Sequence, residues 1–297
     1  MEQAAIITRG LTKSYGPVHA LRGVDLEVHA GEIFGFLGPN GSGKTTTIRC
    51  LLDLIRPDGG SLRVLGLDPQ ADSLAVRARV GYLPGELHFE ENMKVESALR
   101  FLNSLRGVQA DWGLVKQLAG RLDLDLKTVI KNLSKGNKQK VGVIQALMHR
   151  SELLLLDEPT SGLDPLIQQE VLRIVVERKQ EGATIFFSSH ILSEVQEIAD
   201  RVGILRLGKV VEVADTSSLL NRSVRRARVR FKQPVDASLL CQTPGVQLLS
   251  QDDGMSLTLQ IEGEMDGLIK ALAALQVADF ETERSTLEEI FLNYYKE

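Results

Sequence analysis

The stretch from residue 33 to residue 46 reads Ile-Phe-Gly-Phe-Leu-Gly-Pro-Asn-Gly-Ser-Gly-Lys-Thr-Thr, and it says more about the fold than any other part of the chain. Its first five residues form a short apolar run that stops at a glycine, as a buried strand does. Residues 38–45 match the pattern G-x-x-x-x-G-K-[ST] without a departure. Glycines in such a loop let successive backbone N–H groups point at phosphate oxygens. The stretch therefore predicts a strand, a phosphate-binding loop and a helix in succession.

The residue types of this loop indicate a nucleoside triphosphate as the ligand. The Lys44 ammonium can reach the terminal phosphates, and the Thr45 hydroxyl can bind the Mg²⁺ that accompanies them. The helix that begins near Lys44 directs the positive end of its dipole at the same phosphates. A glycine-rich turn that arose by chance is the weaker alternative, because strand, loop, lysine and helix all occur in the required order. The residues expected to hold the nucleotide are Gly38, Pro39, Asn40, Gly41, Ser42, Gly43, Lys44, Thr45 and Thr46.

Polar side chains also follow two other apolar runs, at 153–156 and at 184–187. Continuously apolar runs are typical of strands buried on both faces in a parallel sheet, and ligands bind at the carboxyl ends of such strands. Asp157 is suited to hold Mg²⁺ through water, and Glu158 to accept a proton from an attacking water. A neutral His190 could hydrogen-bond the γ-phosphate and orient that water. The alternatives are acids that only solvate a strand end and a histidine that caps one.

The remaining pattern of the first 220 residues predicts an α/β fold. Ile48, Leu51, Leu52 and Ile55 lie on one face of the helix after the loop, which we expect to end at Pro57 and the Gly59-Gly60 pair. Asp164 and Pro165 predict the cap and first position of another helix. Residues 202–213 predict a hairpin that turns at Leu207-Gly208. The stretch 83–150 is rich in helical patterning and predicts a helical subdomain at about 85–150.

After Asn221 the pattern predicts a small α+β module, and we place the domain boundary between residues 222 and 223. Strands are expected at 227–231, at 246–250 and 257–261 around an Asp253-Gly254 turn, and at 280–283. Helices are expected at 268–275 and 287–295. A ferredoxin-like topology is one possibility. This module, residues 223–297, has no nucleophile, metal cluster or phosphate loop.

Composition restricts the class of protein. The chain has 297 residues, enough for about two domains, and its 43% hydrophobic and 25% charged residues are ordinary for a soluble globular protein. A net charge of -4 does not favour a nucleic-acid binder. The arginines between residues 222 and 230 indicate a charged linker that passes into a strand with a polar face, and docking to an anionic membrane surface or an acidic partner is the weaker alternative. Cys50 and Cys241 suit a reducing cytosol. Neither a signal peptide nor an apolar run of about 18 residues is present in the sequence.

Residues 1 to about 220 resemble the nucleotide-binding subunit of ATP-binding cassette (ABC) transporters, through motifs beyond the phosphate loop. The segment 13–16, Lys-Ser-Tyr-Gly, looks like the family's aromatic loop and would put Tyr15 on the adenine. Residues 133–137 lie where the signature motif falls. The segment 161–164, Ser-Gly-Leu-Asp, resembles the loop that follows the catalytic glutamate and crosses the dimer, and it ends at Asp164. His190 matches the family's switch histidine.

Two departures from the family pattern stand out. The signature is usually Leu-Ser-Gly-Gly-Gln, whereas this chain has Lys135 and Asn137 at its third and fifth positions and keeps Ser134 and Gly136. Such variants resemble the drug- and polysaccharide-exporting branch. In the segment 80–86, Gly85 occupies the position of a glutamine that would bind Mg²⁺ or sense the membrane partner. Either Glu86 or a water could substitute for it.

The resemblance implies a subunit that binds ATP and Mg²⁺ and hydrolyses ATP with Lys44, Glu158 and His190. It implies a dimer in which Ser134, Gly136 and Asp164 of one copy complete the ATP site of the other. The membrane part would be a permease on a separate chain, contacted near residues 82–105, with this subunit cytoplasmic and peripheral on the inner face of the cell membrane. No nucleic acid is expected. The alternatives are a soluble cassette ATPase that acts on a ribosome, DNA or protein partner, and a degenerate subunit that binds ATP without hydrolysis.

Overall fold

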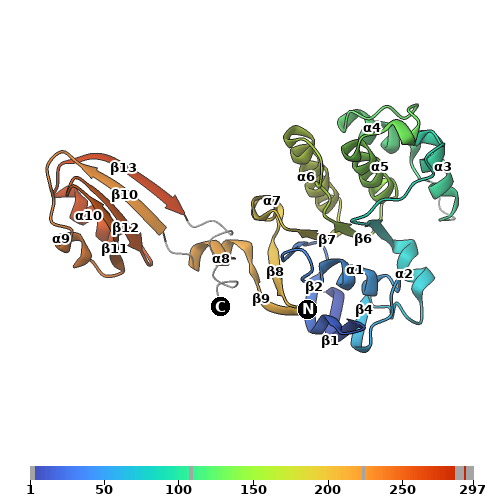
Figure 1. Cartoon of the computed structure of the whole chain (residues 1–297), viewed down its shortest axis with the longest axis horizontal. Helices are drawn as coiled ribbons and strands as arrows, with labels where there is room; N and C mark the ends of the chain where they lie inside the picture. The colour runs from blue at the N-terminus through green and yellow to red at the C-terminus, as the bar shows by residue number, and fades with distance from the viewer. Residues whose placement is uncertain (1–3, 107–109, 223–224, 285–290, 292–297) are drawn as a thin grey trace. The chain divides into compact units, whose positions relative to one another are not determined.

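The structure is a computed structural model that describes residues 4–106, 110–222, 225–284 and 291 (Figure 1). The chain forms two compact units, Met1–Ala214 and Asp215–Glu297. The boundary between the units lies just before the short helix α8 (Thr216–Arg222), whereas the predicted domain boundary at 222–223 lies just after it. Among the described helices, none combines the length and the apolar character that crossing a bilayer requires.

A six-stranded sheet forms the centre of the N-terminal unit. Its strands follow the order β5-β6-β7-β3-β8-β9, and every neighbouring pair from β5 to β8 is parallel. Every residue of β3 and β6 is buried, which explains their continuously apolar sequences. The predicted parallel sheet is therefore confirmed. The strands are β3 (Ile33–Leu37), β5 (Val80–Leu83), β6 (Leu153–Asp157), β7 (Thr184–Ser189), β8 (Arg201–Arg206) and β9 (Lys209–Asp215).

The register of this sheet brings the predicted site residues to one edge. Leu37, the last residue of β3, is paired with Ser189, and Asp157, the last residue of β6, is paired with Ser188. Because the three strands are parallel and in register, the phosphate loop, the acids and His190 all leave the sheet at the same end. The predicted hairpin is also present, and Leu207 and Gly208 between β8 and β9 have φ angles of 48° and 77°.

Helices cover the faces of this sheet (Figure 1): α1 (Lys44–Leu51), α2 (Ser73–Arg79), α6 (Pro165–Gln180) and α7 (Leu192–Ile198). The Asp164 side chain caps α6 as predicted, since its Oδ1 accepts from the Ile167 N–H at 3.1 Å. The prediction for α1 was wrong at its end. The helix stops at Leu51, Asp53 turns left-handed with φ 51°, and Gly59 begins a strand rather than closing the helix.

A second sheet, with order β2-β1-β4, was not singled out in the sequence. It is antiparallel and consists of β1 (Ala4–Tyr15), β2 (Val18–His29) and β4 (Gly59–Val64). Register shifts at several points break the alternation of buried and exposed residues along β1, so the pattern of an amphipathic strand is weak there. The sheet matters for the site because Tyr15 stands at the end of β1.

The helix-rich stretch is confirmed as a set of helices: α3 (Val95–Ser104), α4 (Trp112–Arg121), a 3₁₀ turn η1 (Ile130–Asn132) and α5 (Lys135–Leu147). Ser134 caps α5, and its Oγ accepts from the Asn137 N–H at 3.1 Å. Arg121 joins α4 to α6 through the carboxylates of Glu170 and Glu177.

The C-terminal unit has the order β10 (Arg225–Phe231), α9 (Ser238–Cys241), β11 (Val246–Asp252), β12 (Ser256–Ile261), α10 (Asp266–Ala273) and β13 (Val277–Arg284). Its antiparallel sheet has the strand order β11-β12-β10-β13. This β-α-β-β-α-β arrangement is the ferredoxin-like topology, which confirms that possibility. The expected helix at 287–295 lies outside the described residues, Phe291 excepted.

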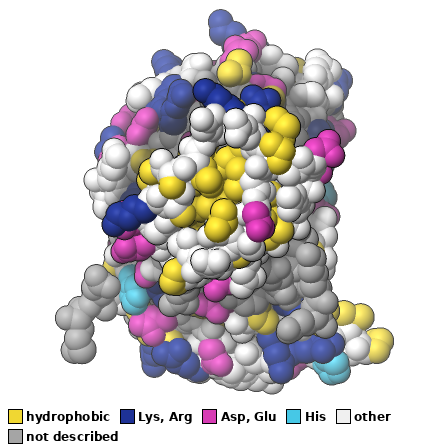
Figure 2. Space-filling view, turned by 90° about the vertical axis from the view of Figure 1, so that its left-hand side faces the viewer, with side chains coloured by type: hydrophobic (Ala, Val, Ile, Leu, Met, Phe, Trp, Pro, Cys, Tyr) yellow, Lys and Arg dark blue, Asp and Glu magenta, His cyan; other side chains and the backbone are white. Residues whose placement is uncertain are grey.

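The exposed surface is mixed in character. In the space-filling view of Figure 2, hydrophobic side chains gather in one patch with charged side chains around it. The exposed large hydrophobic residues of the C-terminal unit, among those described, are Leu239, Leu248, Leu249, Met255, Ile269 and Phe280.

Candidate functional site

The phosphate loop connects β3 to α1, and its geometry requires glycine at two positions. At Gly43, φ is 114°, and a β-carbon there would come within 2.7 Å of the Ala20 carbonyl oxygen. A β-carbon at Gly38 would meet the Leu205 carbonyl oxygen at 2.6 Å. Only glycine adopts such a backbone without strain or collision. The loop is therefore held close to β8 at the end of β3.

Lys44 is almost fully buried at the start of α1. Its ammonium donates to the Gly38 carbonyl oxygen at 2.7 Å and lies 3.3 Å from Glu158 Oε1, close enough for an ion pair but without the alignment of a hydrogen bond. The cation is thus positioned inside the loop, between the loop's carbonyls and the acid. A terminal phosphate that enters the loop meets a localised positive charge there.

Thr45 and Asp157 form a pair of oxygen donors. The Thr45 hydroxyl donates to Asp157 Oδ2 at 2.7 Å, and the Ser188 hydroxyl donates to Asp157 Oδ1 at 2.5 Å. Asp157 and Ser188 are buried, so the carboxylate has a fixed orientation. One hydroxyl and one carboxylate, completed by phosphate oxygens and water, are the ligands that Mg²⁺ takes in nucleotide sites. These residues therefore fit a magnesium ion.

Glu158 has the geometry of a general base held under constraint. Its φ is 53°, a left-handed value that non-glycine residues seldom adopt. Its N–H donates to the Ser188 carbonyl oxygen at 3.1 Å, and Gln139 Nε2 donates to its carbonyl oxygen at 3.0 Å. The Glu158 carboxylate reaches Lys44 with one oxygen, and the other lies 2.6 Å from His190 Nδ1. The acid is therefore placed between a cation and an imidazole.

A pocket of about 310 Å³ opens over the phosphate loop. Tyr15 and Val18 form one side of it, and Glu158 closes the other. Tyr15 is about half exposed, so its ring is available to a flat ligand. The predicted site residues that line this pocket are Tyr15, Pro39, Asn40, Gly41, Gly43, Lys44, Thr45, Thr46 and Glu158. Ser42 belongs to the same loop, and its buried hydroxyl has no hydrogen-bond partner among the described residues.

Gly85 lies against the acid. A β-carbon at this position would be 3.1 Å from Asp157 Oδ2. The loop that follows β5 therefore passes directly beside the Thr45–Asp157 pair. Glu86, one residue further on, is exposed.

Gly38, Ser42, Asp157 and His190 adjoin the residues of this pocket without lining it, whereas three other predicted residues belong to different segments: Ser134, Gly136 and Asp164. Gly136 instead packs on the loop before α6, where a β-carbon would come within 2.6 Å of the Gly162 carbonyl oxygen. Ser134 and Asp164 each cap a helix with an exposed side chain. The three residues thus form a second cluster at the N-terminal ends of α5 and α6.

Sequence reasoning missed three polar residues around the acids. Ser188 orients Asp157, Gln139 holds the carbonyl oxygen of Glu158, and the buried Glu194 accepts from Ser189 Oγ at 3.1 Å. Burial raises the pKa of Glu194, although hydrogen bonds from Thr160 and Ser189 oppose the shift. Ser188 was within reach of prediction, because it precedes His190 at the same strand end. No feature of the sequence around Gln139 predicts its contact with Glu158.

Known proteins resemble this chain over most of its length. A family model described as ABC transporter matches residues 21–161. The daunorubicin/doxorubicin resistance ATP-binding protein DrrA of Streptomyces peucetius is 33% identical over 305 residues, which cover 97% of this chain and 91% of that protein. The bacitracin transport ATP-binding protein BcrA of Bacillus licheniformis is 34% identical over 273 residues, which cover 91% of this chain and 85% of that protein.

A solved structure of the ATP-binding subunit of an ABC transporter superposes with a TM-score of 0.66 at 28% identity, over 72% of this chain and 91% of that one. The pocket over the phosphate loop and these likenesses lead to the same class of protein. The chain belongs to the ABC transporter family. It is an ATP-binding cassette ATPase, and it binds and hydrolyses ATP.

Proposed function

We propose that this chain hydrolyses ATP as a nucleotide-bridged dimer and so drives export by a membrane subunit on a separate chain. One observation carries the hydrolytic part: the Glu158 carboxylate joins Lys44 on one side and His190 on the other, at the edge of the phosphate-loop pocket. In this arrangement a water held by Glu158 lies beside the terminal phosphate of a nucleotide bound in the loop.

Different residues of the pocket bind different parts of the nucleotide in this proposal. Tyr15 contacts the adenine, the N–H groups of the loop bind the phosphates, and Lys44 moves its contact from Glu158 to the terminal phosphate. Thr45 and Asp157 hold Mg²⁺, which neutralises charge on the phosphate oxygens. Release from Lys44 leaves the His190 imidazole in contact with the Glu158 carboxylate. Glu158 then accepts the proton of the attacking water, and His190 orients the acid from its Nδ1 side.

A second copy of the chain completes the site in this proposal. Ser134 and Gly136 lie at the N-terminal end of α5, which is 13 residues long, and they do not line the pocket of their own chain. Free N–H groups at a helix start favour an anion. The γ-phosphate bound by one copy would be that anion for the other, with Asp164 beside it at the start of α6.

The membrane subunit is proposed to contact α3 and the groove behind it. Phe101 on α3 and Leu105, which caps its C-terminal end, are both exposed. Arg106 follows them and lines a pocket of about 330 Å³ with His149 and Ser151.

Within that groove, His149 Nε2 and Ser151 Oγ are buried without a hydrogen-bond partner among the described residues. Burial and the nearby Arg106 lower the pKa of His149, so its imidazole is neutral. Buried polar atoms without partners, beside exposed apolar side chains, suit a partner segment that supplies the missing hydrogen bonds.

Export is the direction that the relatives support, since their names describe drug resistance and bacitracin transport. The variant signature with Lys135 and Asn137 agrees with that branch. A cytoplasmic position on the inner face of the cell membrane follows from this role. The alternative, a cassette ATPase without a transport role, is not favoured by these relatives.

The test compares phosphate release by the wild-type chain and by Glu158→Gln with ATP and Mg²⁺. We expect the substitution to lower kcat by at least about 100-fold, because a positioned general base contributes about 10²–10⁴-fold. ATP affinity should remain, since the loop and Lys44 are unchanged. Gln169→Glu, a change of the same size at an exposed position of α6 outside the pocket, is the control. Equal phosphate release by the wild type and Glu158→Gln would remove the assigned role of Glu158.

A further inference from the structure

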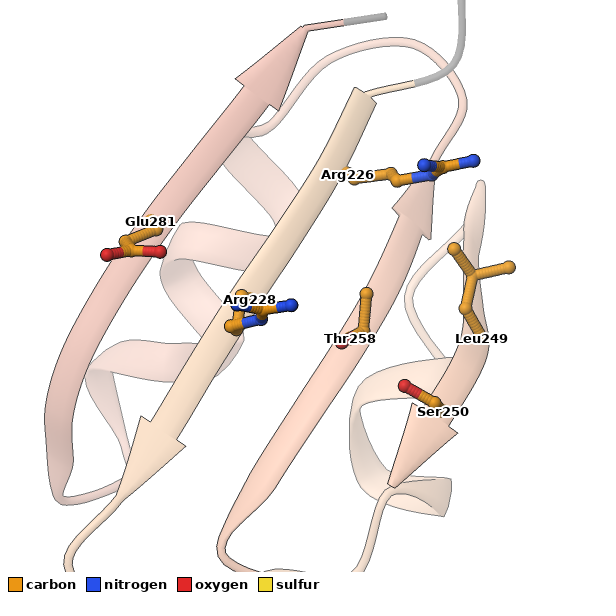
Figure 3. A pocket seen from close by; sticks show the side chains of 6 residues that line it. All are labelled: Arg226, Arg228, Leu249, Ser250, Thr258 and Glu281. Carbon is orange, nitrogen blue, oxygen red and sulfur yellow. The ribbon is translucent and has the colours of Figure 1, made fainter. Parts of the chain in front are cut away.

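The sheet of the C-terminal unit has one covered face and one open face. Ala227 and Val229 of β10 belong to the hydrophobic core on the side of α9 and α10. The alternate residues of the same strand, Arg226, Arg228 and Arg230, are exposed. In the close view of Figure 3, Arg226 and Arg228 stand in front of the strands while the helices lie behind them.

Strand β13 places carboxylates beside these arginines. Arg228 is paired in register with Glu281, and Arg230 with Asp279. The Arg230 guanidinium lies 3.6 Å from the Asp279 carboxylate. Arg228 and Glu281 are different, because within the part of the chain that the structure describes neither side chain takes part in a hydrogen bond or an ion pair. The open face thus carries a positive row beside a negative row, with an unpaired member in each.

The other half of the open face, on β11 and β12, is mostly uncharged, with Asp252 at the end of β11. Leu249, Ser250 and Thr258 line a shallow pocket of about 260 Å³ beside the arginine row (Figure 3).

A face with this pattern is complementary to a copy of itself. A two-fold axis that runs parallel to the strands, midway between β10 and β13, turns a second sheet over and lays its β13 on β10 of the first. Each arginine row then meets a carboxylate row. Arg228 faces Glu281 of the second copy, and Glu281 faces its Arg228. A two-fold axis across the strands would instead oppose like charges, which costs several kcal/mol.

We infer that the open face of the C-terminal sheet binds the same face of a second copy of this chain, with Arg228 of each copy paired to Glu281 of the other. Facing sheets pack about 10 Å apart, a gap that an arginine and a glutamate side chain together span. An anionic membrane fits this face less well, because Asp279 and Glu281 lie on it beside the arginines.

The size of the face sets its role. The two-fold arrangement covers only β10 and β13 of each copy, and two strands about 4.8 Å apart and six residues long present about 200 Å², a quarter of the roughly 800 Å² per partner of a typical stable interface. The contact is therefore weak by itself. Given the nucleotide-bridged dimer proposed above, it keeps the two copies at a high local concentration when the ATP sites open.

Sedimentation of the full-length chain without nucleotide tests the inference. We expect a monomer–dimer equilibrium at concentrations up to about 100 µM, as small interfaces give, and weaker association as salt rises. Arg228→Glu and Glu281→Arg should each weaken association by about tenfold or more, because each creates two like-charge pairs. An equimolar mixture of the two variants should associate as the wild type does. In a dimer of one Arg228→Glu chain and one Glu281→Arg chain, residue 228 of each copy faces residue 281 of the other copy with the opposite charge. Within each variant chain, residues 228 and 281 carry the same charge.

Lys270→Glu, which makes the same change of charge on α10 behind the sheet, is the matched control and should associate as the wild type does. Glu158→Gln should do so too, so that a failure of the hydrolytic proposal is told apart from a failure of this one. A wild-type chain that stays monomeric, including one that binds vesicles of phosphatidylglycerol instead, would overturn the inference. So would a mixture that remains as dissociated as the single variants.

Discussion

Ser188→Ala tests whether the acid that is proposed to hold Mg²⁺ depends on its neighbour on β7. The Ser188 hydroxyl donates to Asp157 Oδ1 at 2.5 Å, and both residues are buried. A hydrogen bond to a charged group contributes about 1.5–3 kcal/mol, so the variant should lose that much free energy of unfolding. Losing a residue that orients a metal ligand typically lowers metal affinity by 10–100-fold. We therefore expect the Mg²⁺ concentration for half-maximal ATPase activity to rise by about 10-fold or more.

The neighbouring residue provides the matched control. Ser189 is equally buried and its hydroxyl also donates to a carboxylate, that of Glu194 at 3.1 Å, but it does not touch Asp157. Ser189→Ala should lose a comparable free energy of unfolding and keep the wild-type Mg²⁺ dependence. Chemical denaturation gives the first quantity, and phosphate release titrated with Mg²⁺ gives the second. The same Mg²⁺ dependence in both variants would refute the role of Ser188 in orienting the acid.

Two further changes test the fold around the site. Burial raises the pKa of Glu194 above the ordinary 4.5, so the native state binds more protons than the unfolded chain and stability falls as the pH rises through that range. Glu194→Gln removes this loss, and its advantage in free energy of unfolding should grow as the pH rises above 4.5; an offset that does not vary with pH would contradict the assignment. Arg121→Ala removes the links from α4 to two carboxylates of α6, at 2.5 Å and 2.8 Å, and should cost about 1–2 kcal/mol, because the pairs are charge-assisted but partly exposed. That cost should shrink in high salt, and denaturation with and without added salt measures it.

The sequence by itself determined the parts of the site that are contiguous. Residues 38–45 form one loop whose backbone conformation is set by its own glycines, and Asp157 and Glu158 follow a run of leucines whose burial is evident from composition. Helix starts were also predictable, because the caps at Ser134 and Asp164 bond to N–H groups only three residues away. Local interactions of this kind depend on residue type and spacing alone.

Only the tertiary structure decided which distant residues meet. Ser188 reaches Asp157 because β6 and β7 are parallel and in register, and a shift of one residue would turn its side chain to the other face. The open face of the C-terminal sheet has the same origin, since Arg228 and Glu281 become neighbours only through the pairing of β10 with β13. Register is set by packing over the whole sheet, and no segment of sequence contains that information by itself.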